Sequence, residues 1–515
     1  MEFDRRQFIG ALGAGALGAP AILRAQAVFR DYPFRLGVAA GDPAPDGFVI
    51  WTRLAPDPLE QQGGMPMVPV EVEWEVGADS RFATIAQAGK AIARPELGHA
   101  VHVEVGGLQP GRPYWYRFRI GRERSIVGTA RTVPLQAAKV RFGVAGCQAY
   151  EDGFYTAYRH MAAEADLDFV YHYGDYIYEG RAQPVAIGYD GRLKPFVREV
   201  VGGEIYSLDD YRRRYAQAKL DPDLQAAHAA AAWFVTMDDH EIDNNWVQDI
   251  DQDDTPRDIF RYRRAAAWQA WYEHMPVRRA SMPNASGVQV YRRQRYGDLL
   301  TAHFCDTRQF RSDQPCDDGF KPDCPGTSDP KAVVLGSQQE KWLVDGLRGA
   351  GTRWNAVCQQ IMMMRLDRRT GKEPVPIRNI DSWAAYLAPR DRLLSSMKGL
   401  GNVVVLTGDE HQNFAGEVAP SATPDRPVAV EFVSTSISSG GDGGDKRYGT
   451  EQIIANSPEL KWTNDQRGYL LCDVGRDLWN TQYRVLDKVS TRDGQIATRA
   501  TATVERGKVK VEGLA

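Results

Sequence analysis

From about residue 139 onward, short apolar runs alternate with segments whose apolar residues recur at helical spacing. The runs cover residues 140–145, 169–173, 233–237, 354–361 and 403–406, and helical spacing is evident at 258–275 and 338–348. Residues 288–295 and 299–305 flank a Tyr296-Gly297 turn and predict an inserted hairpin. Because strands that alternate with helices build layered α/β domains, we predict that fold class for residues 137–515.

Before that point the chain has a different pattern. Residues 48–52, 70–74, 102–105 and 114–118 are alternating or aromatic-rich, and turn residues such as Gln109-Pro110-Gly111 separate them. Regular short strands of this kind favour an antiparallel β-sandwich, and the turn before the last strand resembles a fibronectin-type module. We therefore expect an all-β fibronectin- or Ig-like sandwich domain over residues 28–136, without visible chemistry of its own.

Length and charge set outer limits. A chain of 515 residues predicts two or three domains. Its 63 Lys and Arg residues nearly balance 67 Asp and Glu residues, a net charge of −4. This balance gives no electrostatic case for nucleic acid as the main partner, although it allows a small phosphate ester as substrate.

The first residues have the layout of an export signal. Arg5-Arg6 precedes hydrophobic residues, a weakly apolar Gly/Ala stretch follows at 10–19, and Ala25-Gln26-Ala27 offers small residues to a peptidase. This layout is typical of a bacterial Tat signal over residues 1–27, and the apolar stretch is too short for a stable membrane span. We expect the Tat export machinery as a partner and a periplasmic or secreted location. Because Tat exports folded proteins, the signal also hints at a cofactor.

Six cysteines divide into three kinds. Cys316 and Cys324 lie in a Pro/Gly/Asp-rich loop and are the most plausible disulfide pair in an exported protein. Three others lie in apolar strand-like runs, where buried thiols are expected: Cys305, Cys358 and Cys472. Cys147 stands apart, because it ends a run at the start of the α/β region.

Polar, ligand-capable residues follow four of the apolar runs. The four segments are Gly146-Cys147, Gly174-Asp175-Tyr176-Ile177-Tyr178, Asp238-Asp239-His240-Glu241 and Gly408-Asp409-Glu410-His411. Open α/β sheets place ligands at the carboxyl ends of their strands, so the four segments could converge on one site.

The GDxxY and GDxH segments resemble the dinuclear metallophosphoesterases of the purple acid phosphatase lineage, and the variants here resemble the narrower PhoD-like alkaline phosphatase/phosphodiesterase family. Further segments support this resemblance, which runs from about residue 33 to 487: 40–43, 51–54, 306–315, 335–343, 381–383 and 390–394. The resemblance implies iron and calcium as metals. It assigns Cys147, Asp175, Tyr178 and His411 to iron, and Asp175, Asp239 and Asp409 to calcium.

The ligand chemistry supports the same division. A thiolate, a phenolate, a carboxylate and an imidazole suit Fe(III), and the oxygen-only group suits Ca²⁺, Mg²⁺ or Mn²⁺. Gln360 and Asp409 stand where dinuclear relatives have histidines, which favours calcium over zinc or iron at the second site. We expect Fe(III) with one or two Ca²⁺ ions.

Several roles stay open at this stage. Asp409 is either a ligand or an acceptor that orients His411, and Tyr176 is the neighbour most easily confused with Tyr178. Asn244, Asn245 and Gln360 are weaker candidates for ligands or phosphate contacts. His172 and His303 lie within strand-like runs, where structural histidines are more usual.

These residues together predict an exported phosphoric ester hydrolase that uses metal-activated hydroxide, with phosphate acquisition as its role. Asp175 would bridge the metals, and His240 would act as acid or hydrogen-bond donor to the leaving oxygen. Arg308 or Arg390 could clamp the phosphate. The alternatives are a phospholipase-like or nuclease-like phosphodiesterase, and a non-catalytic exported binding protein.

Overall fold

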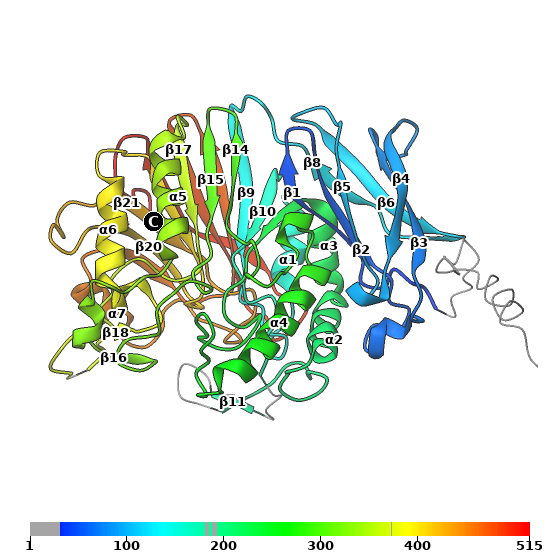
Figure 1. Ribbon diagram of the computed structural model, residues 1–515. Coiled ribbons are helices and arrows are strands. Elements are labelled where there is room, and N and C mark those ends of the chain that lie inside the picture. The colour runs from blue at the N-terminus through cyan, green and yellow to red at the C-terminus, as the bar shows by residue number, and fades with distance from the viewer. Residues whose placement is uncertain (1–30, 181–184, 188–192, 372, 515) are drawn as a thin grey trace, which may run out of the picture.

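The computed structural model describes residues 31–180, 185–187, 193–371 and 373–514 (Figure 1). The predicted export signal lies outside these residues. Among the helices that are described, none is long and apolar enough to cross a membrane.

Two large mixed sheets form the centre of the molecule. The first has nine strands, in the order β25(Ile496–Glu505), β24(Leu478–Leu486), β23(Gly468–Gly475), β9(Lys139–Ala145), β10(Phe169–His172), β13(Ala232–Val235), β1(Val38–Ala44), β2(Gly47–Arg53) and β5(Ala100–Val105). The second has seven, in the order β14(Arg292–Tyr296), β15(Leu300–Phe304), β17(Trp354–Cys358), β19(Val403–Thr407), β21(Ala429–Val433), β20(Asn413–Val418) and β22(Leu460–Asn464).

Parallel pairing dominates the middle of both sheets. Strands β9, β10, β13 and β1 are parallel neighbours, as are β15, β17, β19 and β21. Their carboxyl ends therefore lie at one edge of each sheet. The predicted hairpin is present as the antiparallel pair β14–β15, and the C-terminal residues contribute β25 at one edge of the first sheet.

Apolar side chains from both sheets fill the space between them, among them Phe142, Phe304, Leu406 and Phe432. Helices cover the outer faces. Four pack on the first sheet, namely α1(Thr156–Ala162), α2(Leu208–Lys219), α3(Pro222–Ala230) and α4(Arg257–His274). Two pack on the second, α5(Gly336–Gly349) and α6(Leu387–Met397), and α7(Thr450–Asn456) lies beside β22. Helices thus flank a two-sheet core, as predicted.

Local sequence explains where the helices near the site begin. Ser207 caps α2 by accepting from the Asp210 backbone N–H, and the Asp210 carboxylate accepts from the Ser207 N–H. Asp221 caps α3, and Pro222 at its first position needs no hydrogen-bond partner for its nitrogen. These caps fix two neighbouring helices, of which α3 lies against β1 and β13 of the first sheet.

Between residues 31 and 136, the part that the structure describes, the N-terminal region is built of strands and 3-10 turns. A five-stranded sheet forms from β4(Ile85–Ala93), β3(Val70–Gly77), β6(Pro113–Ile120), β7(Glu123–Arg124) and β8(Gly128–Arg131), and it packs on β1, β2 and β5 through a common apolar core. Figure 1 shows these strands at the right of the molecule. Because β1 pairs with β13, the N-terminal strands extend the first large sheet, a long-range pairing that the sequence did not indicate. The predicted boundary at residue 136 stays a prediction.

Two short ribbons lie near the ends of the large sheets. They are β11(Val185–Ile187) with β12(Leu193–Pro195), and β16(Phe320–Pro322) with β18(Ile377–Asn379). Cys316 and Cys324 form a disulfide just before and after β16, and the free thiols at 305, 358 and 472 are buried, both as predicted.

Candidate metal centre

The four polar segments meet where the parallel strands end. Cys147 follows β9, Asp175 follows β10, Asp239 follows β13, and Asp409 and His411 follow β19. Ligand-capable atoms from these segments form three groups, and within each group all atoms lie within 4.8 Å of one another. Asp175 belongs to all three groups, which is the arrangement expected of a residue shared between two metal ions.

The backbone of these segments is strained at several candidate ligands. Cys147, Asp175, Asp409 and His411 adopt left-handed conformations, with φ of 50°, 56°, 66° and 49°. Left-handed backbone is unfavourable for residues with a Cβ and clusters at functional sites. Gly174 has a φ of 140°, and a Cβ there would lie 2.3 Å from the Asp238 nitrogen, so only glycine fits before Asp175.

The first donor group contains the four side chains that the sequence assigned to iron. Cys147 Sγ lies 3.2 Å from Asp175 Oδ2. The Tyr178 hydroxyl lies 3.0 Å from the same oxygen and 3.1 Å from His411 Nε2. Tyr176, the neighbour that could be confused with Tyr178, is not part of this group. Its hydroxyl lies 2.8 Å from His228 Nε2.

These four side chains fit a metal ion of high charge. Burial, together with Asp175, raises the pKa of the Cys147 thiol and of the Tyr178 hydroxyl far above their usual values. A strongly Lewis-acidic cation is the partner that stabilises thiolate and phenolate in such surroundings. Burial and then Arg467 lower the pKa of His411, so its imidazole is neutral and able to coordinate.

The second donor group is made of carboxylates alone. It consists of Asp175, Asp238, Asp239 and Asp409. Burial and then Asp239 raise the pKa of Asp175, while burial and then Asp238 raise that of Asp409. Oxygen-only groups of this kind fit hard cations such as Ca²⁺.

Asp238 is a member that sequence reasoning missed. Its Oδ1 accepts a hydrogen bond of 2.6 Å from Arg308 Nε, and its buried Oδ2 has no hydrogen-bond partner among the described residues. Burial raises its pKa to about 7. Its place beside Asp239 after β13 was the available signal.

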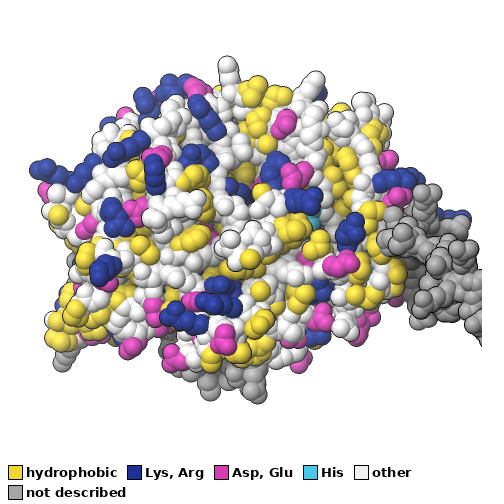
Figure 2. All heavy atoms as spheres, viewed as in Figure 1, with side chains coloured by type: hydrophobic (Ala, Val, Ile, Leu, Met, Phe, Trp, Pro, Cys, Tyr) yellow, Lys and Arg dark blue, Asp and Glu magenta, His cyan; other side chains and the backbone are white. Residues whose placement is uncertain are grey.

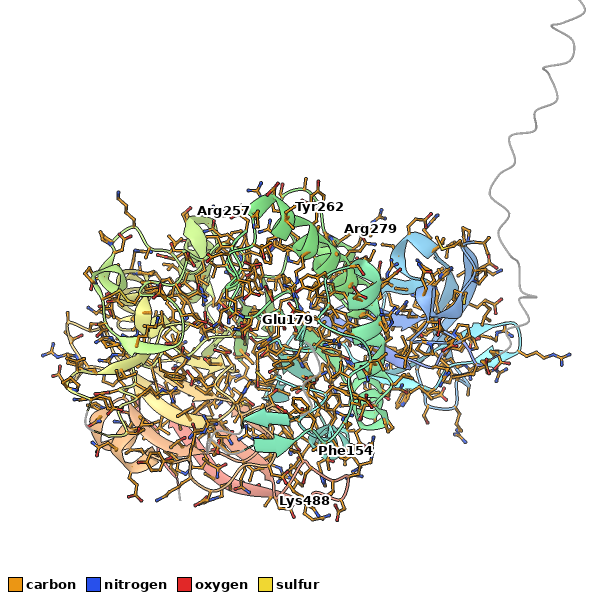
Figure 3. The ribbon with its side chains drawn as sticks, turned by 90° about the horizontal axis from the view of Figure 1, so that it is seen from below. Phe154, Glu179, Arg257, Tyr262, Arg279 and Lys488 are labelled. Atoms are coloured by element: carbon orange, nitrogen blue, oxygen red, sulfur yellow. A yellow bond between two sulfur atoms is a disulfide. The ribbon has the colours of Figure 1, made fainter. Side chains whose placement is uncertain are left out.

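His240 is held by a carboxylate at the edge of the centre. Its Nδ1 lies 2.7 Å from Glu179 Oε2, and its ring lies 4.0 Å from the Tyr178 ring, centroid to centroid. Although burial lowers the pKa of His240, the carboxylates of Glu179 and Asp239 raise it well above its usual value. Figure 3 shows Glu179 near the middle of the molecule, seen from below Figure 1.

Glu179 and Glu241 are further residues that the sequence did not reveal as partners. Glu241 is buried and accepts the backbone N–H groups of Asp175, Tyr176 and Asp238. It therefore ties the loop after β10 to the loop after β13. The only signal was that each glutamate is adjacent to a candidate ligand or acid in the sequence.

The two predicted phosphate clamps have different surroundings. Arg308 is buried against Asp238, Asp239 and Asp381 at the carboxylate group. Arg390 lies on α6 and bonds the carbonyls of Met363 and Ala419 and the Glu459 carboxylate. All nitrogens of Arg390 have such partners, so the suggestion that it clamps phosphate is wrong.

The weaker candidates for ligands or phosphate contacts also differ in their hydrogen-bond partners. Gln360 is fully engaged with Thr307, Thr236 and Cys305, so a ligand role for it is wrong. His303 pairs with Asn355 inside β15 as a structural histidine, and His172 Nε2 lies 3.3 Å from Gln148. Asn245 donates its backbone N–H to Asp239 Oδ2 at 2.7 Å, while the Asn244 side chain bonds Gln252.

Two helix-flanked sheets with adjoining candidate donor groups at the strand ends are the arrangement of a metallophosphoesterase. The same fold occurs in a purple acid phosphatase from yellow lupin (Lupinus luteus) seeds, which is 12% identical with a TM-score of 0.56 and covers 93% of this chain and 75% of the other.

Closer matches identify the family. The sequence model of the PhoD-like phosphatase matches residues 142–483, and that of the PhoD-like phosphatase N-terminal domain matches residues 19–134. Alkaline phosphatase D of Bacillus subtilis (strain 168) is 44% identical over 521 residues, 98% of this chain and 88% of the relative. A solved structure of PhoD is 43% identical with a TM-score of 0.90 and covers 95% of this chain and 93% of the other. The chain belongs to the PhoD-like phosphatase family and is a phosphoric ester hydrolase, as the sequence predicted.

Proposed function

We propose that this protein is an exported phosphatase and phosphodiesterase that holds Fe(III) and Ca²⁺ side by side. The observation that carries the proposal is that Asp175 is shared between two donor groups of different chemistry. Cys147, Tyr178 and His411 complete a group with sulfur, phenol and imidazole donors, whereas Asp239 and Asp409 complete a group with oxygen alone. Soft or strongly basic anionic donors suit Fe(III), and carboxylates suit Ca²⁺.

When bound, the metal ions supply positive charge for the phosphoryl oxygens and lower the pKa of a water molecule. The side chains of this protein then have distinct tasks. His240 donates a proton or a hydrogen bond to the leaving oxygen, and Glu179 fixes its ring by accepting from Nδ1. Arg308 lowers the pKa of the Asp238 and Asp239 carboxyls and holds both in place through its two nearby contacts.

The test begins with purified protein that carries its native metals. Elemental analysis should find iron and calcium, and hydrolysis of para-nitrophenyl phosphate and of its bis ester should stop with a calcium chelator and return with Ca²⁺. The ratio of the two rates assigns monoester or diester preference. Iron-free protein with full turnover would contradict the iron assignment, and turnover that ignores the chelator would contradict the calcium assignment.

We also propose export through the Tat pathway and a role in phosphate acquisition. The support is the Arg5-Arg6 pair with its following apolar stretch, and a hydrolase of phosphate esters outside the cytoplasm releases phosphate for uptake. A strain that carries Arg5→Lys/Arg6→Lys should retain the enzyme in the cytoplasm and should lose growth on a phosphate ester as sole phosphorus source. Unchanged export of the double variant would contradict the pathway.

The surface adds little to the choice of substrate. On the face drawn in Figure 2, basic and acidic side chains are interspersed. The charges on that face therefore give no preference for one ester.

A further inference from the structure

Three hydrogen bonds converge on Asn245, which lies in the loop after β13. Its backbone N–H donates to Asp239 Oδ2 at 2.7 Å. Its carbonyl accepts from Gln314 Nε2 at 2.7 Å, and its side-chain amide donates to Asp318 Oδ2. Its φ is 52°, a left-handed conformation that asparagine tolerates better than most residues. Asn245 thus carries a contact from residues 314–318 to the carboxylate of Asp239.

Residues 314–319, which contact Asn245, have little regular structure of their own. Cys316, Asp317 and Gly319 all have left-handed backbone, with φ of 67°, 58° and 90°. The Asp317 side chain is 91% exposed, and Phe320 is also exposed. Apolar burial therefore contributes little to the conformation of this loop.

A disulfide bond, and not apolar burial, restricts the conformation of this loop. The Cys316–Cys324 disulfide closes a loop of short sequence separation, and β16 within that loop pairs with β18. A cross-link of this kind restricts the conformations open to the residues between the cysteines. Asp318 lies two residues after Cys316, so the disulfide restricts the carboxylate that Asn245 contacts.

We propose that the disulfide-closed loop 316–324 is a support for the oxygen-only donor group, with Asp318 and Asn245 as positioning residues for Asp239. The proposal rests on the function proposed above in that it takes Asp239 as a calcium ligand. Loss of the disulfide or of Asp318 frees Asn245, and the Asp239 carboxylate loses the N–H that fixes its Oδ2. Calcium affinity then depends on the oxidation state of a cysteine pair that touches no metal.

The experiment compares Asp318→Ala and Cys316→Ser/Cys324→Ser with Asp317→Ala in the full mature chain. The control removes the same charge from the neighbouring position, where the side chain only pairs with Lys321 at the surface. Isothermal titration calorimetry with Ca²⁺ should show a dissociation constant raised at least fivefold in the first two variants and changed less than twofold in the control. Reductant added to the wild-type protein should reproduce the effect of the cysteine variant.

A second readout does not depend on calcium. In metal-depleted protein, hydrogen exchange of the peptide that covers residues 239–247 should be faster in Asp318→Ala and in the cysteine variant, and unchanged in Asp317→Ala. Equal exchange in all variants overturns the positioning proposal, whatever the metal. Faster exchange together with no calcium binding by the wild-type protein upholds the positioning of Asn245 and overturns the calcium assignment instead.

Discussion

Glu179 Oε2 lies 2.7 Å from His240 Nδ1, and the other oxygen of the same carboxylate accepts the backbone N–H of Asn244 at 2.8 Å. The Glu179 side chain is 6% exposed, so both contacts are shielded from water. The described residues offer no hydrogen bond to His240 Nε2, which leaves this nitrogen available to a substrate. The carboxylate therefore fixes the direction of the ring and favours the protonated form, which can donate from Nε2.

This geometry predicts a dependence on the leaving group. Glu179→Gln weakens the hold on His240 and removes the charge that stabilises its protonated form. Turnover of phenyl phosphate, whose leaving oxygen needs a proton donor, should fall by about 10²-fold, whereas that of para-nitrophenyl phosphate should fall by about threefold or less. Steady-state kinetics with both esters provide the measurement.

Glu204→Gln is the matched control, because Glu204 pairs with Arg263 and lies outside the three candidate donor groups. It should leave both rates within twofold. Equal losses for the two esters in Glu179→Gln would mean that Glu179 supports the fold of the site and not proton donation.

A second prediction concerns colour. Phenolate bound to Fe(III) gives an absorption band in the visible range, and Tyr178 is the tyrosine whose hydroxyl lies between Asp175 and His411. Tyr178→Phe should remove the phenolate part of this absorption, leave the part that the Cys147 thiolate contributes, and lower turnover by at least about tenfold. Tyr176→Phe should keep the band, because that hydroxyl bonds His228. Absorption spectra of the two purified variants decide the matter, and a spectrum that Tyr178→Phe leaves unchanged would remove tyrosine from the iron group.

The convergence of the donor groups was predictable because it follows from strand direction. Cys147, Asp175, Asp239 and Asp409 each come directly after an apolar run, and parallel strands bring such positions to one edge. The change of pattern near Lys139 likewise marks the start of β9. The role of these four residues after the strands as metal ligands stays a prediction.

Contacts between loops were not predictable in this way. Glu179 contacts His240 because the loops after β10 and β13 lie against each other, and no periodicity in the sequence predicts that contact. Arg390 looked like a phosphate clamp, yet its position on α6 turns it toward Glu459. The pairing of β1 with β13 joins residues about 190 positions apart, such as Ala40 and Ala232, and the local sequence pattern cannot predict it.

A third prediction tests the balance of charge at the carboxylate group. Arg308 is 1% exposed and lies within 4 Å of Asp238, Asp239 and Asp381. Arg308→Met leaves Asp238 without its cation, although Asp381 keeps its pair with Arg311. Removal of one partner from a buried ion pair costs about 3–5 kcal/mol. Chemical denaturation should show that loss in metal-depleted protein and a smaller loss with Ca²⁺ present. A loss below about 1 kcal/mol without metal would show that the carboxylates are protonated when alone.

A fourth prediction concerns Lys219, the last residue of α2. Its side chain is buried, with Nζ 4.3 Å from the centre of the Trp51 ring and 5.1 Å from that of Tyr176. No described carboxylate forms an ion pair with it. Burial lowers its pKa from 10.5 to about 7. Between these two values the unfolded chain binds a proton that the folded protein has released, so stability rises with pH across this window.

Lys219→Met removes the cost of burying the amine, so it should stabilise the protein most at the low end of the window. The expected gain in the free energy of unfolding is about 4 kcal/mol at pH 7 and about 1 kcal/mol at pH 10. Measurements should stay at or above pH 7, because burial lowers the pKa of the neighbouring His172 and His228 and both are neutral there. Denaturation curves of the variant and the wild type at pH 7, 8.5 and 10 give the comparison. A gain that is constant with pH would mean that Lys219 keeps its charge in the folded protein, and that the two aromatic rings stabilise it in full.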